Sequence, residues 1–232
     1  IRSLEWMDNE IVLFSANLSE NSDFEPSNSD IYSLDIKSGE IKKLTERFGP
    51  DSSPKISPNK KYIAYLGYDD KFLGYQQNSL YVMDTNGGNV KLLSDDFDRN
   101  ISNINWKEDG KGLYFQYDTE GMTKIGYISL SGDIKDVVDE LGGLSLGRPY
   151  SGGTYTISEN GRYAFTYGNV YNPADLAVGI NGSKNRLTKL NDDLFQFKSL
   201  GKVEEVWYSS SYDGKKIQGW LVYPPDFDPN KK

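Results

Sequence analysis

One pentapeptide has the residue pattern of a hydrolytic nucleophile. Gly143-Leu-Ser145-Leu-Gly147 matches G-x-S-x-G, a motif in which the serine is exposed at a sharp turn between a strand and a helix. Pro149 follows closely and is badly placed for such a helix. The chain also has no His, so no imidazole can act as the general base. We therefore predict that Ser145 is not a nucleophile and that residues 142–153 form a glycine-rich, flexible connection.

The residue types that are missing exclude further chemistry. Without Cys and His, the chain has no disulfide, no thiolate and no His-ligated metal site. The acidic clusters Asp95–Asp98 and Asn191–Asp193 carry carboxylates of the kind that bind Ca²⁺, but neither has the spacing of an EF-hand loop. We interpret both as solvated turns and expect no metal and no cofactor. A glycosidase with paired carboxylates is a remote alternative, because no spacing singles out a pair.

Composition limits the partners. The 232 residues carry a net charge of −8, which argues against nucleic acid and against an anionic membrane surface. No apolar run approaches the ~18 residues of a membrane span, and no signal peptide is evident at the N-terminus. We expect a cytoplasmic protein. The 13% aromatic content and 23 Gly favour strands joined by many short turns.

An internal repeat organises the chain. Similar hairpin segments begin at Trp6, Ile56, Trp106 and Ile157, and these starts are 50, 50 and 51 residues apart. Each begins with an apolar residue, continues through a polar turn and ends in an alternating apolar strand, which indicates a β-hairpin. The segments resemble the W-S-P-D-G-K-x-I-A-F signature of TolB-type and peptidase propeller blades.

A second hairpin follows in each repeat, with turn glycines at Gly39, Gly88, Gly132 and Gly182. Two hairpins per repeat make a four-stranded antiparallel blade, and radial repetition of blades makes a propeller. The strands of a β-sandwich also alternate apolar and polar residues, but a sandwich gives no reason for a sequence repeat of 50 residues. We predict an all-β fold with about four four-stranded antiparallel blades of a larger propeller. Their expected bounds are 1–48, 49–99, 100–150 and 151–203.

The segment Glu204–Pro229 departs from the repeat. It reads E-E-V-W-Y-S-S-S-Y-D-G-K-K-I-Q-G-W-L-V-Y-P-P-D-F-D-P, in which two short strands flank an Asp-Gly turn. This string resembles the start of the α/β-hydrolase domain in the prolyl oligopeptidase family of serine peptidases, and is most similar to the acylaminoacyl-peptidase branch. The resemblance implies a propeller, usually seven-bladed, before residue 204. It also implies that residues 204–232 are a linker and the first strands of a truncated hydrolase domain.

The same resemblance implies a function and partners. The chain would be the non-catalytic propeller portion of a serine peptidase, gating the access of peptide substrates to its own α/β-hydrolase domain, which this chain lacks. Propeller residues facing that domain contact substrate in several members of the family, and Arg148 and Tyr150 are the candidates here. No catalytic residue can be mapped onto the chain. The alternative is a TolB-like scaffold that binds a protein partner.

Two polar insertions occupy matching places in the first two repeats, Asn17–Asn28 and Asp69–Gln77. Phe72, Leu73 and Tyr75 interrupt the second insertion, and such aromatic side chains either bind a substrate or fold back onto the blade. The truncation implied by the resemblance has two further consequences. We expect incomplete packing of Trp220 and Tyr223, and self-association through open blade faces.

Overall fold

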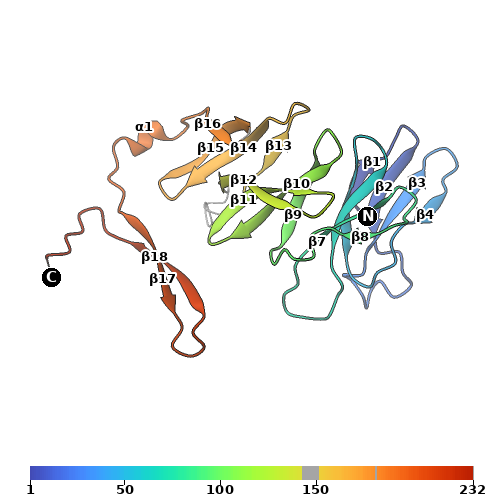
Figure 1. Cartoon of the computed structure of the whole chain (residues 1–232), viewed down its shortest axis with the longest axis horizontal. Coiled ribbons are helices and arrows are strands. Elements are labelled where there is room, and N and C mark those ends of the chain that lie inside the picture. Colours follow the sequence, from blue (N-terminus) through green and yellow to red (C-terminus); the bar gives the residue numbers. More distant parts are fainter. Residues whose placement is uncertain (143–151, 181, 232) are drawn as a thin grey trace.

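The computed structural model describes residues 1–142, 152–180 and 182–231. These residues form two four-stranded antiparallel sheets and one eight-stranded sheet, followed by a separate hairpin (Figure 1). The eight-stranded sheet divides into two four-stranded halves, which we call the third and fourth sheets. The first sheet contains β1 (Arg2–Trp6), β2 (Ile11–Ala16), β3 (Asp30–Asp35) and β4 (Ile41–Lys43). The second contains β5 (Asp51–Ile56), β6 (Tyr62–Gly67), β7 (Ser79–Asp84) and β8 (Lys91–Leu92).

The third sheet contains β9 (Ile101–Trp106), β10 (Gly112–Thr119), β11 (Met122–Ser129) and β12 (Ile134–Leu141). The fourth contains β13 (Tyr155–Ile157), β14 (Tyr163–Asn169), β15 (Asn172–Ile180) and β16 (Ser183–Arg186). The short helix α1 (Asp192–Phe195) follows, and the hairpin consists of β17 (Val203–Ser209) and β18 (Lys216–Val222). A single pairing, Leu141 with Tyr167, connects the third and fourth sheets.

Each sheet follows the order of its strands in the sequence, and consecutive strands pair as hairpins. The turns have the backbone shape that their glycines permit: Gly39, Gly110 and Gly132 all have positive φ angles, of 75°, 64° and 104°. The predicted four-stranded antiparallel blades are therefore confirmed.

Apolar side chains on both faces of the inner blades hold the sheets together. In β6, Ile63 and Tyr65 pack against the first sheet, whereas Ala64 and Leu66 pack against the third. This follows from the alternation of side chains along a strand. A strand that lies between two neighbouring blades must therefore be apolar at successive positions.

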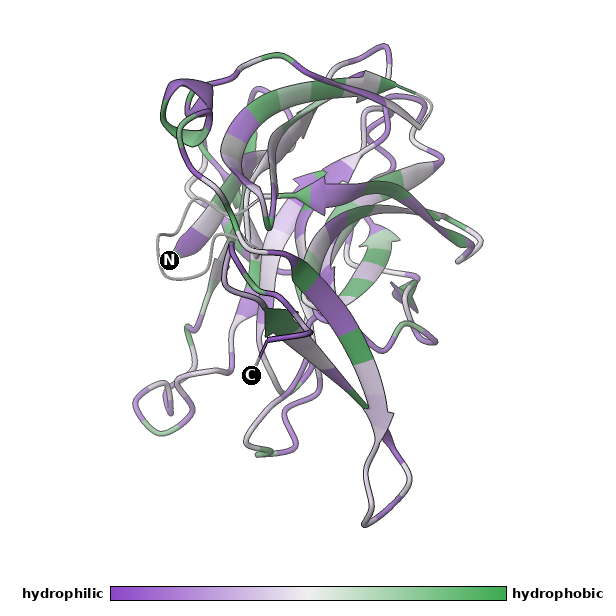
Figure 2. Ribbon diagram, turned by 90° about the vertical axis from the view of Figure 1, so that its left-hand side faces the viewer, coloured by the Kyte–Doolittle hydropathy of each residue, from purple (hydrophilic) through white to green (hydrophobic). Residues whose placement is uncertain are grey.

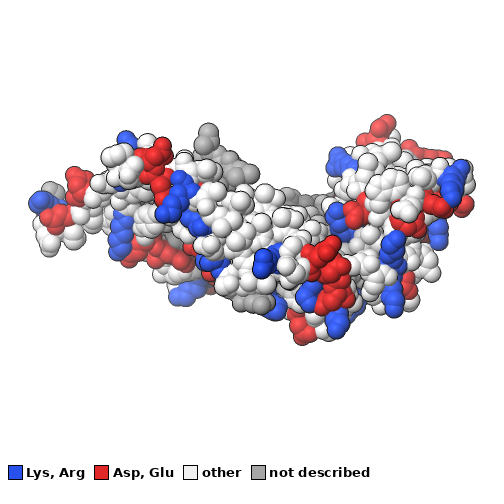
Figure 3. All heavy atoms as spheres, turned by 90° about the horizontal axis from the view of Figure 1, so that it is seen from above, with Lys and Arg blue, Asp and Glu red and all other residues white. Residues whose placement is uncertain are grey.

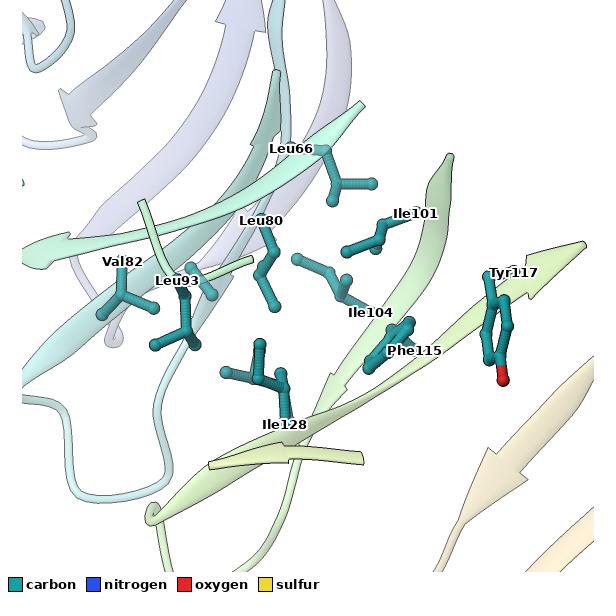
Figure 4. Packing of buried hydrophobic residues seen from close by; sticks show 11 residues of the cluster. Leu66, Leu80, Val82, Leu93, Ile101, Ile104, Phe115, Tyr117 and Ile128 are labelled. Carbon is teal, nitrogen blue, oxygen red and sulfur yellow. The ribbon is translucent and has the colours of Figure 1, made fainter. Parts of the chain in front are cut away.

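The core between the second and third sheets is the largest of these contacts (Figure 4). Leu66, Leu80 and Leu93 from one blade meet Ile104 and Phe115 from the next. A similar core joins the third and fourth sheets, and its buried residues are Tyr114, Ile125, Val138, Leu141, Tyr155, Tyr163, Phe165 and Ala177. Every one of these cores combines residues from two sheets, so each blade depends on its neighbour.

Trp106 adds a hydrogen bond to the contact between the second and third sheets. The indole N–H of Trp106 donates to the backbone carbonyl of Lys55 at 2.9 Å, which connects β9 to β5 of the neighbouring sheet. Lys55 also forms an ion pair with Glu5 of the first sheet, at 2.7 Å. The first strands of three successive blades, β1, β5 and β9, are thus connected by polar contacts.

We expect the substitution Phe115→Ala to destabilise the chain by about 3–5 kcal/mol, because it removes a ring with no solvent exposure from the core between two blades. The measurement is the free energy of unfolding in urea. Phe24→Ala is the matched control, since that ring is 89% exposed, and its cost should stay within about 0.5 kcal/mol. Equal effects of the two substitutions would contradict the assignment of this core.

Candidate functional site

The connections between strands leave the blades at two opposite edges. In the first three sheets, antiparallel pairing places the turns after odd-numbered strands at one edge and the connections after even-numbered strands at the other. The first edge has short turns. The second edge, which we call the loop rim, consists of residues 17–29, 44–50, 68–78, 93–100 and 120–121 (Figure 1). Binding residues are commonly found on loops that a rigid scaffold positions, so the loop rim is the candidate site.

Two loops of the rim pack against each other. Residues 44–50 connect the first two sheets, and residues 68–78 connect β6 with β7. The backbone N–H of Asp70 donates to the carbonyl of Phe48 at 3.0 Å. The rings of Phe48 and Phe72 lie in tilted contact, with centroids 5.6 Å apart. The two loops therefore act as one structural unit.

An ion pair with a fully buried carboxylate anchors this unit. The guanidinium of Arg47 contacts the carboxylate of Asp51, which has no solvent exposure. The same guanidinium donates to the hydroxyl of Tyr81 at 2.8 Å, lies 4.3 Å from the centroid of that ring, and reaches the carboxylate of Asp69 at 3.5 Å. Tyr65 stacks on Tyr81 with centroids 5.2 Å apart. Arg47 thus connects β5, β7 and loop 68–78.

Burial dominates the electrostatics of this cluster. It raises the pKa of Asp51 to about 6, although the charge of Arg47 opposes the rise. Burial would lower the pKa of Arg47, but the charge of Asp51 and its hydrogen bond outweigh burial and raise it. Burial also raises the pKa of Tyr65 and of Tyr81. The nitrogen Nε of Arg47 and the oxygen Oδ2 of Asp51 are buried without a hydrogen-bond partner, so the pair is incompletely satisfied.

The loop between β6 and β7 presents apolar side chains to solvent. The carboxylate of Asp70 closes it by accepting hydrogen bonds from the backbone N–H of Phe72 at 2.8 Å and from the side chain of Gln76 at 2.7 Å. Between these anchors Phe72 is 81% exposed, Leu73 59% and Tyr75 89%. Of the two interpretations that the sequence leaves open, folding back onto the blade is therefore wrong.

The hairpin β17–β18 is docked on the same rim. The side-chain amide of Gln218 donates to the carbonyl of Glu120 at 3.0 Å. The indole of Trp220 lies over Gly121, where an added Cβ would come within 3.0 Å of Cζ2 of the ring. Gly121 has a φ of 71°, so both its conformation and its contact favour glycine. The turn between β10 and β11 is thus shaped to receive the hairpin.

A second contact ties the hairpin to the fourth sheet. The backbone N–H of Val203 donates to the hydroxyl of Tyr171, in the turn between β14 and β15, at 2.9 Å. Trp220 remains 42% exposed and Tyr223 is half-buried, which confirms the expected incomplete packing. Figure 2 shows the tip of the hairpin projecting away from the sheets.

The acidic clusters differ from each other in structure. Asp98 is 93% exposed and lies 3.7 Å from Arg99. Asp192 instead begins α1 and pairs with Arg186 at 2.7 Å. Among the described residues, no group of three or more Asp or Glu side chains is placed to hold a metal ion. Within the same residues, no helix has the length and apolar character to cross a membrane. Figure 3 shows acidic and basic side chains interspersed on the face seen from above.

Comparison with known proteins places the chain by sequence and by fold. No family model matches it. It is 30% identical over 211 residues to dipeptidyl-peptidase 5 of Porphyromonas gingivalis, which covers 88% of this chain and 29% of that relative. An acylaminoacyl peptidase solved with Z-Gly-Gly-Phe-chloromethyl ketone superposes with a TM-score of 0.75 and 20% identity, over 99% of this chain and 33% of that one. TolB from Acinetobacter baumannii gives a TM-score of 0.56 and 18% identity, over 95% and 51%.

The sequence relationship to a peptidase and the superposition along nearly the whole chain, hairpin included, agree with the resemblance carried by Glu204–Pro229. The resemblance to the prolyl oligopeptidase family is therefore confirmed. It spans less than a third of the relative from P. gingivalis. The TolB superposition shows that the blades are a shared propeller fold.

The substrate-contact candidates proposed from the sequence, Arg148 and Tyr150, cannot be placed. Ser145, Arg148 and Tyr150 all lie outside the described residues. The loop rim offers other residues that sequence reasoning missed, namely Arg47 and Asp51. The signal available for them was weak, because one Arg four residues before an Asp is common and does not reveal that both become buried between two blades.

We expect that removing one partner of the Arg47–Asp51 ion pair lowers the free energy of unfolding strongly, whereas replacing both partners with apolar residues lowers it little. Arg47→Met leaves an unpaired buried carboxylate and should reduce the free energy of unfolding by about 3–5 kcal/mol. The double variant Arg47→Met/Asp51→Leu should recover most of that loss, as measured in urea at pH 7. A double variant as unstable as the single one would contradict this account.

Comparing the same double variant with the parent chain at several pH values tests the raised pKa of Asp51. Because folding raises this pKa from 3.8 to about 6, the folded state holds the proton more tightly, and ionisation of Asp51 costs stability as pH rises from about 4 to 6. The free energy of unfolding of the double variant should therefore rise relative to the parent over that range, by up to about 3 kcal/mol. A constant difference would place the folded pKa near 3.8.

We expect Gly121→Ala to disturb the docking of the hairpin, because the new methyl group would meet the indole of Trp220. The measurement is the indole N–H resonance of Trp220 in nitrogen-15 NMR, assigned with Trp220→Phe. Gly39→Ala is the matched control, since Gly39 has a similar φ of 75° and no atom within 4 Å of an added Cβ. A resonance unchanged by Gly121→Ala, or shifted equally by Gly39→Ala, would show that the contact is not maintained.

Proposed function

We propose that this chain is the propeller portion of a serine peptidase and that it controls the access of peptides to a catalytic domain. The observation that carries the proposal is the hairpin β17–β18, which is held on the loop rim by Gln218 and Trp220. This hairpin belongs to the segment that resembles the start of the hydrolase domain in the family. The partners that we propose are therefore that hydrolase domain and the peptides that it cleaves.

The geometry supports a role in access. Loops on the rim that receives the hairpin are long and present apolar side chains, whereas the opposite edge of the first three sheets has short turns. A domain attached through the hairpin would face these loops. Peptides reaching its active site would then pass the rim, while a folded protein would be excluded by size.

The chemistry itself is assigned to the catalytic domain. This chain has no His, so it lacks the base that a serine nucleophile needs. The relatives suggest two kinds of substrate, which differ at the peptide's amino terminus. A dipeptidyl-peptidase, as the relative from P. gingivalis is named, releases dipeptides from a free amino terminus. An acylaminoacyl peptidase, as the structural neighbour is named, removes an acylated residue.

A TolB-like scaffold that binds a protein partner is the second candidate function, and the superposition on TolB favours it. The two candidates differ in what they predict for the hairpin. A scaffold has no need of a docked strand pair after the last blade, whereas a peptidase uses it to connect a second domain.

We expect hydrolysis only when the native reading frame is continued past Lys232. The chain of 232 residues and the continued form are assayed in parallel with a dipeptide nitroanilide, with its N-acetylated counterpart, and with a fluorophosphonate that labels active-site serines. Cleavage and labelling confined to the continued form support the peptidase. A continued form that is neither labelled nor active would overturn the proposal and favour the scaffold.

A further inference from the structure

A cavity of about 330 Å³ lies on the loop rim beside loop 68–78. Leu73 and Tyr75 from this loop line it, together with Tyr81 of β7. The lining also includes the charged residues Asp69, Lys71 and Asp98. None of the cavity's residues is catalytic in the proposed function.

The apolar wall of this cavity is held open by the loop itself. Asp70 and Gln76 close the base of the loop, and the packing of Phe72 on Phe48 fixes its orientation. Leu73 and Tyr75 consequently remain 59% and 89% exposed instead of collapsing onto the blade. Exposed apolar side chains that a soluble protein keeps in place commonly mark a binding surface.

The lining carries charges of both signs. Two carboxylates, Asp69 and Asp98, face one ammonium group, that of Lys71. Asp69 forms an ion pair with Arg47 at 3.5 Å, whereas Asp98 is 93% exposed and lies 3.7 Å from Arg99. Asp98 is therefore the carboxylate most accessible to a cationic ligand. A ligand that complements this cavity combines an apolar group with a positive charge.

We propose that this cavity binds one or two residues of an extended peptide, taking an apolar side chain against Leu73 and Tyr75 and an adjacent basic group near Asp98. The proposal rests on the proposed function, in which peptides pass the loop rim. The volume fits this occupant, because it lies at the lower end of the range of small-ligand sites. The cavity thus gives the propeller a sequence preference in addition to its exclusion of folded proteins.

The experiment measures binding of two short peptides to the 232-residue chain by fluorescence anisotropy, with the dye at the peptide's carboxyl end. One peptide contains adjacent Leu and Lys, and the other has Ser and Gln in their places. We expect the first to bind more tightly. Tyr75→Ala should weaken its binding about ten-fold, in line with the loss of a buried apolar contact. Asp98→Asn should weaken it about two- to five-fold, and less so in high salt.

Phe24→Ala is the matched control, because Phe24 is an 89% exposed aromatic residue on another loop of the same rim. This substitution should leave both affinities unchanged. Equal binding of the two peptides, or an equal loss with Phe24→Ala, would overturn the inference. Because the assay needs no catalysis, its outcome is separate from that of the hydrolysis test. Selective binding without any hydrolysis in the continued form would support the cavity and overturn the peptidase.

Discussion

The apolar contact between neighbouring blades is the constraint on which the rest of the structure depends. A four-stranded sheet of this kind has two apolar faces, and a face covered by another blade contributes to stability only while that blade is folded. In β6, the side chain of Ile63 packs against the first sheet and that of the adjacent Ala64 packs against the third. The blades are therefore joined by packed cores, and the loops at their edges can be irregular without weakening these cores.

Polar groups also lie at the junctions between blades, outside the apolar cores. The Arg47–Asp51 pair lies at the junction of two blades, where an incompletely satisfied ion pair contributes little net stability. Its position nonetheless fixes the geometry of the junction, since Arg47 contacts β5, β7 and loop 68–78 together. Gly49 next to it approaches the carbonyl of Tyr68 so closely that no side chain would fit. The apolar cores stabilise the blades, and the contacts at the junction fix the orientation of the adjoining loops.

The sequence predicts the blades well because their signal is local and repeated. A polar turn between alternating apolar strands identifies a hairpin, and the repeat that begins at Trp6, Ile56 and Trp106 identifies their radial arrangement. The candidate site was predicted less completely. Phe72, Leu73 and Tyr75 could be singled out, but their exposure depends on the hydrogen bonds of Asp70 with Gln76 and on Phe48 from another connection. Such contacts join segments whose spacing carries no periodic signal.

The docking of the hairpin also has a consequence for the order of folding. Strand pairing within a blade joins neighbours in the sequence, whereas Gln218 and Glu120 are separated by 98 residues. Contacts of short separation form early, because they close small loops at low entropic cost. During synthesis, the third blade can be complete before the hairpin leaves the ribosome, so the turn at Gly121 is ready when the hairpin arrives. The folded third blade thus provides the surface on which the hairpin docks.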